Sequence, residues 1–163
     1  MTDNMMFVLG LINKKPNNAY ELIKELDKYS DVGYKMMPES TVYVILKSLC
    51  NKGYIIGNTV KEGNFPAKTI YNITYNGKIE LEKAIKNSII DIDLSSSNFA
   101  IAILFFDIFS NEELRVLLNI REETLQSQLN KVSKYNDDLN ILAISLLESQ
   151  ITLLKSLYKK LNL

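Results

Sequence analysis

The side chains best suited to chemistry in this chain are hydroxyl and lysine groups on a predicted helix, in the stretch PESTVYVILKSLCNKGYI at residues 38–55. Pro38 lies near the start of that helix and Gly53 just past its end, as is common at helix termini. Its apolar residues recur at helical spacing and predict one buried face, formed by Val42, Ile45, Leu46 and Leu49. The polar residues lie away from that face, so they can hydrogen-bond a ligand; they are Ser40, Thr41, Lys47 and Ser48.

Catalytic chemistry has little support in the sequence. The chain contains no histidine, which is the commonest general base and the commonest metal ligand. Its acidic pairs are neighbours in sequence, so on a helix their side chains point about 100° apart and do not converge on one site. A glycine-rich phosphate loop and a nucleophile paired with a base are also missing. We therefore expect no enzyme, no catalytic residue, no metal site and no cofactor.

Charge is divided unevenly along the chain, although the formal net charge is zero. Residues 1–90 contain 12 Lys against 9 Asp and Glu, a net charge of +3, whereas residues 91–163 contain 7 Lys and Arg against 10 Asp and Glu, a net charge of −3. The N-terminal half is therefore the part that favours an anionic partner.

The order of predicted elements in the first half is three helices, a β-hairpin and a fourth helix. Helices are predicted near residues 5–13, 18–28 and 38–52, with Asn18 as an N-cap. Two β-rich segments at 54–60 and 68–74 flank turn residues and predict a hairpin, or wing. A helix then follows from Thr74 to about residue 87, with Ile79, Leu81 and Ile85 available for packing. This order is typical of a winged helix-turn-helix domain.

The second half predicts helices only, starting with an apolar helix at 99–109. Ser110 with Glu113 then forms a capping box at the start of a long helix, and a final helix begins at Leu139. We expect the two long helices to form a coiled-coil-like dimerisation domain, because one chain supplies few elements to cover their apolar faces. The fold class is therefore mainly α with a small β-hairpin wing, in two domains, 1–90 for DNA binding and 91–163 for dimerisation. The predicted dimerisation residues are Leu114, Leu118, Leu125, Leu129, Leu142, Leu146, Leu153 and Leu157.

Three stretches resemble the PadR family of bacterial transcriptional regulators: AYELIKEL at 19–26, STVYVILKSLCNKGYI at 40–55 and GNFPAKTIYNITYNGKIEL at 63–81. The resemblance implies a homodimeric repressor that binds an operator in double-stranded DNA, which we expect to be palindromic, and whose DNA affinity is often relieved in the family by a small effector or a stress signal. The single cysteine excludes an intramolecular disulfide framework, so we expect the protein to be cytoplasmic. It also implies a site made by the third helix and the wing. The candidate DNA-binding residues are Tyr20, Ser40, Thr41, Tyr43, Val44, Lys47, Ser48, Lys61, Asn64 and Lys68.

The sequence departs from the family pattern in one respect that bears on base reading. Many family members have a basic residue just before the wing proline, where this chain has Phe65, and residues 1–90 contain no arginine. Bidentate arginine contacts to guanine are therefore not available, so bases must be read by Lys47, Asn51, the hydroxyl residues or the wing.

Several alternative interpretations remain open from the sequence. The polar helix face can be an ordinary solvated face, and the wing or the helical hairpin can serve as a protein-interaction module without specific DNA binding. Phe99 and Phe106 can line an effector pocket, although aromatic residues at helical spacing are more often core. Cys50 is expected to be a packed thiol, and redox sensing is the lesser option. The longest uninterrupted apolar run, at 99–106, is too short to cross a bilayer, and the N-terminus has no secretion signal, so we expect no membrane association.

Overall fold

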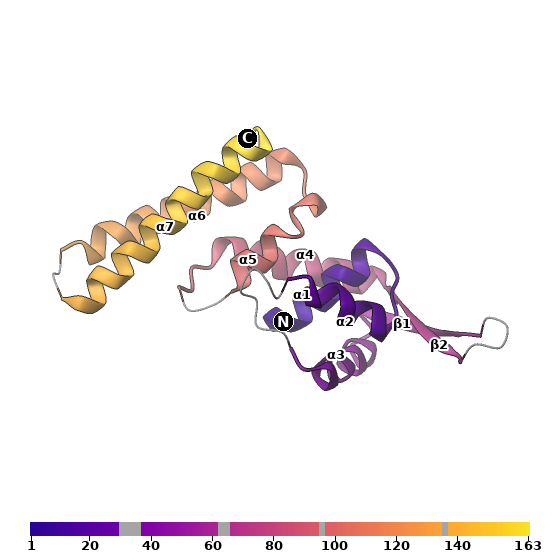
Figure 1. Ribbon diagram of the computed structural model, residues 1–163. Helices are drawn as coiled ribbons and strands as arrows, with labels where there is room; N and C mark the ends of the chain where they lie inside the picture. Colours follow the sequence, from indigo (N-terminus) through magenta and orange to yellow (C-terminus); the bar gives the residue numbers. More distant parts are fainter. Residues whose placement is uncertain (30–36, 62–65, 95–96, 135–136) are drawn as a thin grey trace. The chain divides into compact units, whose positions relative to one another are not determined.

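The computed structural model describes residues 1–29, 37–61, 66–94, 97–134 and 137–163. The chain divides into two compact units, Met1–Ala84 and Ile85–Leu163 (Figure 1). The architecture is mainly helical, with a two-stranded antiparallel hairpin after the third helix and two long C-terminal helices that pack together. The predicted fold class is therefore confirmed.

Three helices build the core of the N-terminal unit. They are α1 (Asp3–Lys14), α2 (Ala19–Asp27) and α3 (Glu39–Asn51), and α3 packs against both α1 and α2. The apolar stripe predicted for α3 is buried, with Leu49 fully enclosed. Asn18 caps α2 as predicted, because its side chain accepts a hydrogen bond from the backbone N–H of Glu21 at 3.0 Å. Gly53 ends the α3 segment with a φ of +68°, the left-handed conformation expected of a glycine after a helix.

The wing consists of β1 (Ile55–Val60) and β2 (Lys68–Ile73), paired in antiparallel register with Gly57 opposite Tyr71. A short bridge ties this hairpin to the segment before α2. The backbone N–H of Asn17 donates to the carbonyl oxygen of Tyr71 at 3.2 Å, and the N–H of Tyr71 donates to the carbonyl of Asn17 at 2.8 Å. The wing and α2 are thereby held at a fixed separation.

The fourth helix, α4 (Tyr75–Ile90), begins at a tight junction with the hairpin. The hydroxyl of Thr74 donates to the carbonyl oxygen of Gly53 at 2.6 Å and accepts from the backbone N–H of Gly77 at 3.0 Å. Gly77 is buried, and a Cβ atom added to it would lie 2.0 Å from the carbonyl oxygen of Tyr54, so no larger residue fits there without a shift. The helix runs about one turn further than predicted, and Ile79 is 49% exposed, so its predicted packing role within this chain is wrong.

The apolar segment at 99–109 is not one helix, contrary to the prediction. It forms α5 (Asn98–Ile103) and then the 3-10 helix η2 (Phe106–Ile108). The backbone hydrogen bonds here span three residues instead of four, as in the bond that the N–H of Phe105 donates to the carbonyl oxygen of Ala102 at 3.0 Å. The segment is rich in isoleucine and phenylalanine, which lose side-chain freedom in a helix and lower its stability.

The two long helices of the C-terminal unit are α6 (Asn111–Val132) and α7 (Asp138–Leu161), which pack against each other. The predicted capping box at the start of α6 is confirmed. The backbone N–H of Glu113 donates to the Ser110 hydroxyl at 3.3 Å, and the N–H of Ser110 donates to the Glu113 carboxylate at 3.1 Å. These bonds lower the pKa of Glu113 below its ordinary value.

Among the described residues, α7 is also the helix whose length and composition would allow it to cross a membrane. Its most apolar 18-residue window has a mean hydropathy of 1.3, and 22% of that window is buried. The sequence prediction considered only uninterrupted apolar runs, and polar residues interrupt this helix. A single helix of this kind is weak evidence for a membrane span, because helices of soluble proteins satisfy the same criterion.

Candidate nucleic-acid interface

The outer face of α3 presents most of the residues that the sequence singled out. Tyr43 is 55% exposed and Val44 is 66% exposed, and Ser40 and Lys47 are also exposed. Thr41 and Ser48 are half-buried. Because the buried stripe anchors the opposite side of α3, this polar face is fixed in orientation and open to a ligand.

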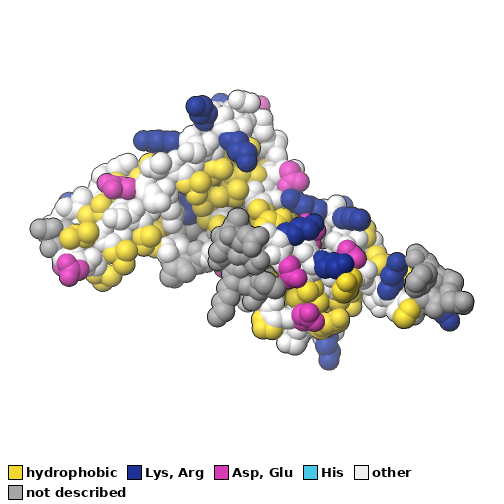
Figure 2. Space-filling view, viewed as in Figure 1, with side chains coloured by type: hydrophobic (Ala, Val, Ile, Leu, Met, Phe, Trp, Pro, Cys, Tyr) yellow, Lys and Arg dark blue, Asp and Glu magenta, His cyan; other side chains and the backbone are white. Residues whose placement is uncertain are grey.

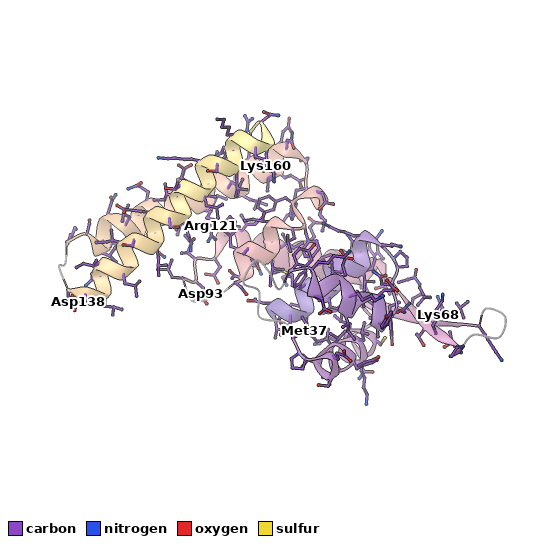
Figure 3. All side chains as sticks on the ribbon, in the orientation of Figure 1. Met37, Lys68, Asp93, Arg121, Asp138 and Lys160 are labelled. Carbon is purple, nitrogen blue, oxygen red and sulfur yellow. The ribbon has the colours of Figure 1, made fainter. Side chains whose placement is uncertain are left out.

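The wing carries the second group of predicted residues. Lys68 is the first residue of β2, at the end of the hairpin far from the helices (Figure 3). Lys61 follows the last residue of β1, and both lysines are exposed. Asn64 lies outside the described residues. In the space-filling view, lysine side chains are visible on the hairpin (Figure 2). Two cations are therefore placed at the end of a rigid, hydrogen-bonded ribbon.

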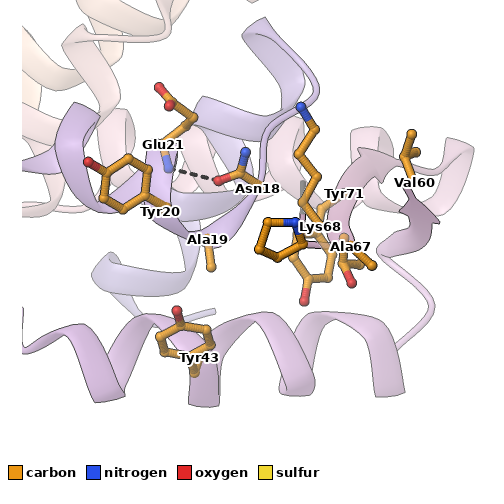
Figure 4. Close-up of a pocket in the computed structure, with 11 residues that line it drawn as sticks. Asn18, Ala19, Tyr20, Glu21, Tyr43, Val60, Ala67, Lys68 and Tyr71 are labelled. Carbon is orange, nitrogen blue, oxygen red and sulfur yellow. Dashed lines mark hydrogen bonds between the residues drawn. The ribbon is translucent and has the colours of Figure 1, made fainter. Parts of the chain in front are cut away.

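A groove of about 920 Å³ separates the start of α2 and the outer face of α3 from the wing. It brings together three predicted residues from three elements, Tyr20 of α2, Tyr43 of α3 and Lys68 of β2 (Figure 4). Sequence reasoning did not assign Asn18 or Tyr71 to the site, and both line this groove. The motif KTIYNIT contained a signal for Tyr71, because it places that residue on the same strand face as Thr69.

Electrostatic contacts and burial affect groups on two of the tyrosines that line the groove. Lys24 Nζ lies 4.4 Å from the centre of the Tyr20 ring, and this contact with Tyr20 raises the pKa of the lysine. Burial raises the pKa of Tyr71, so its phenol remains protonated at neutral pH. Glu21 is the acidic residue among the described residues that line the groove, and its backbone N–H donates to the Asn18 side chain. Among the described residues, the groove is therefore lined by phenol hydroxyl groups and by Lys68, which are groups of the kind that bond phosphate and sugar oxygens.

Cys50 lies at the end of α3 and is half-buried. Burial raises the pKa of its thiol, which reduces the thiolate fraction at neutral pH. A reactive cysteine requires the opposite shift. This environment supports the interpretation of Cys50 as a packed thiol.

The predicted dimerisation leucines fall into two groups. Leu114, Leu118 and Leu125 of α6 and Leu157 of α7 are buried within one chain, and Leu129 is half-buried, so these residues form or border the core of the helical pair. Leu142, Leu146 and Leu153 are 56%, 39% and 40% exposed, and Leu139, which was not predicted, is 75% exposed. At 100° per residue these four leucines fall within about 60° of helix surface. We call Leu139, Leu142, Leu146 and Leu153 the α7 stripe.

The two aromatic residues predicted for an effector pocket are buried. The rings of Phe99 and Phe106 lie 6.3 Å apart, and the guanidinium of Arg121 lies 3.7 Å from the centre of the Phe99 ring. These contacts are those of packed core residues. Arg121 itself is 1% exposed and was not among the residues predicted from the sequence.

One family model and several solved structures are similar to this chain. The model of the transcriptional regulator PadR-like family matches residues 8–83. A solved structure of Bacillus subtilis PadR in complex with operator DNA has 17% identity, covers 96% of this chain and 98% of that chain, and has a TM-score of 0.49. The same protein in complex with p-coumaric acid has 16% identity, coverage of 99% and 100%, and a TM-score of 0.44. The structure of smu.1604c from Streptococcus mutans UA159 has 24% identity, coverage of 97% and 95%, and a TM-score of 0.44. No curated protein matches the sequence.

Proposed function

Because residues 8–83 belong to the PadR-like transcriptional regulator family, we propose that the chain is a homodimeric, DNA-binding repressor of that family. Its family is one of transcriptional regulators and not of enzymes. The observation that carries the proposal is the exposed face of α3, which bears hydroxyl groups and Lys47 and adjoins the groove that Lys68 lines from the wing. A bacterial repressor of this kind acts in the cytoplasm, where its operator lies.

In this proposal α3 enters the major groove of one half-site. Lys47 contacts the acceptor atoms of guanine, and Val44 contacts a thymine methyl group, because these are the groups that each base presents there. Ser40 and Thr41, at the start of α3, bond phosphate oxygens near the end of the helix. With no arginine in residues 1–90, base reading depends on one lysine and on apolar and hydroxyl contacts.

The wing and the groove bind the backbone of the same DNA. Lys61 and Lys68 neutralise phosphates, and Tyr20 and Tyr43 supply phenol hydroxyl groups from α2 and α3. Phosphate contacts contribute affinity and orientation without reading sequence. The Asn17–Tyr71 bridge fixes the separation of α2 from β2. This separation sets the width of the groove into which one strand of the DNA must fit.

Dimerisation through the α7 stripe explains why four leucines are exposed on one side of a helix. Pairing of two copies would bury them, and a twofold dimer would present two α3 helices to a palindromic operator. An effector that changes the packing of the C-terminal unit would alter the separation of the two α3 helices and release the DNA.

A mobility-shift titration with the DNA upstream of the chain's own gene tests the proposal. We expect the parent to shift this fragment in the presence of excess unrelated DNA, and Lys47→Ala to lose that preference. Lys131→Ala, an exposed lysine on α6, is the matched control and should bind as the parent does. If the parent binds no DNA under any salt condition, the surface serves protein recognition and the proposal is wrong.

A further inference from the structure

Lys24, an exposed residue of α2, is a cation beside the groove and has no role in the DNA contacts described above. Its Nζ lies 4.4 Å from the centre of the ring of Tyr20, which is one turn earlier on the same helix. Tyr20 is 60% exposed and lines the groove (Figure 4). Residues four apart lie on the same face of a helix, so the ammonium of Lys24 and the phenol of Tyr20 are presented together on the α2 side of the groove.

The contact with Tyr20 also restricts the lysine side chain. A cation over an aromatic ring is attracted to the negative face of that ring. The contact with the Tyr20 phenol raises the pKa of Lys24 above its ordinary value, with a smaller contribution from the carboxylate of Glu21. Lys24 is therefore charged at physiological pH. A long side chain that is already held in place loses less conformational entropy when it binds a ligand.

Glu21 gives the α2 side of the groove a charge that repels DNA. It is the acidic residue among the described residues that line the groove, and it lies three positions before Lys24. Residues three apart are neighbours on a helix surface. The ammonium of Lys24 therefore offsets the carboxylate of Glu21, and an approaching phosphate meets a cation and a phenol on this side of the groove.

We propose that Lys24 binds a phosphate of the operator together with Tyr20, so that one DNA strand is held between α2 and Lys68 of the wing. The bridge between Asn17 and Tyr71 lies just before α2 and ties it to β2, so the two cationic sides of the groove keep their separation. All of these residues belong to the N-terminal unit. This inference rests on the proposed function and adds a phosphate-binding residue to the same site.

The first test compares Lys24→Gln with Lys28→Gln, which removes the same charge one turn further along α2. Glutamine has nearly the helix propensity of lysine, and Lys28 is the matched control because its Nζ is paired with Glu25 at 2.6 Å. On a DNA fragment that the parent binds, the salt slope of Lys24→Gln should be shallower by about 0.9. Its loss of affinity should thus be about 3.5-fold larger at 50 mM than at 200 mM salt. Lys28→Gln should keep the parental slope, and Lys24→Arg should restore it.

A second measurement locates the phosphate itself. Fragments that each carry one uncharged methylphosphonate in place of a phosphate are titrated with the parent and with Lys24→Gln. We expect one position in each half-site where the methylphosphonate weakens the parent but not the variant, because two groups in contact are not additive. If the parent binds no DNA, the proposed function fails. If the parent binds but no position shows this coupling, or if Lys24→Gln keeps the parental salt slope, the inference is overturned and the proposed function stands.

A role for Lys24 that consists only of neutralising Glu21 gives a different result. In that case Lys24→Gln would lower the affinity of the parent but not that of a chain that already carries Glu21→Gln. The proposal predicts a loss of the same size in both backgrounds, since the phosphate contact is removed from each. A loss confined to the chain with Glu21 would overturn the inference.

Discussion

Leu146, near the middle of α7, offers a direct way to perturb the proposed dimer. It is 39% exposed in one chain. Full burial of a leucine contributes about 1.5–3 kcal/mol, so burial of the exposed part contributes about 1 kcal/mol in each subunit. In Leu146→Asp this contribution is lost twice, and two carboxylates are brought into an apolar interface, at a cost of several kcal/mol. The total of at least about 5 kcal/mol predicts a dimer dissociation constant more than a thousandfold higher.

Light scattering over a concentration series measures this effect. The parent should have twice the chain mass of 18.6 kDa, and Leu146→Asp should have the mass of one chain. Ser145→Asp is the control, because it introduces the same charge one residue away, on the polar side of α7. The reasoning is refuted if Leu146→Asp remains a dimer, or if Ser145→Asp dissociates equally.

Three further predictions concern the DNA-binding unit. Lys68→Ala should weaken binding to operator and unrelated DNA alike and lower the salt slope of binding by about one unit, because one phosphate contact is lost. Lys47→Ala should weaken operator binding by about 1–3 kcal/mol and binding to unrelated DNA much less. Filter-binding titrations at several salt concentrations distinguish the two variants. Gly77→Ala would place a Cβ 2.0 Å from the carbonyl oxygen of Tyr54, so we expect a loss of about 3 kcal/mol in a urea titration, the upper part of the range for overpacking. Cys50 should react with iodoacetamide more slowly than a free thiol at pH 8, since a raised pKa leaves less thiolate, and the rate should rise towards that of a free thiol as the pH increases.

Each of these predictions has an internal control. Gly53→Ala places no atom within 4 Å of another group, so its expected cost of about 1 kcal/mol comes only from the left-handed backbone. An equal loss in both glycine variants would contradict the steric argument. Unfolding in urea should remove the protection of Cys50, and a fast reaction in the folded protein would make redox sensing the better interpretation. If Lys68→Ala leaves the salt slope unchanged, the wing does not contact phosphate.

Local signals predicted most of the elements because each signal depends on neighbours in sequence. The buried stripe of α3, the left-handed Gly53 and the Ser110 capping box follow from spacing along the chain, and the structure confirms them. Ile79 shows the limit of this reasoning, because an apolar residue at helical spacing is buried only when another element covers it.

Long-range features of the site could not be derived in this way. The groove depends on the bridge between Asn17 and Tyr71, which are far apart in sequence. Arg121 is buried because its donors meet the end of α4 and Gln150, again at long range. Leu139 was predicted only as the first residue of the final helix, and the structure places it on the α7 stripe. Three-dimensional contacts decide all of these positions.

The central claim is that two copies of the α3 and wing surface bind two half-sites of DNA. Selection of bound DNA from a random-sequence pool, using the full chain at physiological salt, tests it most directly. The account predicts an inverted repeat with half-sites about one helical turn apart, or a multiple of one turn. Recovery of DNA with no shared sequence, or of a single half-site without symmetry, would contradict it.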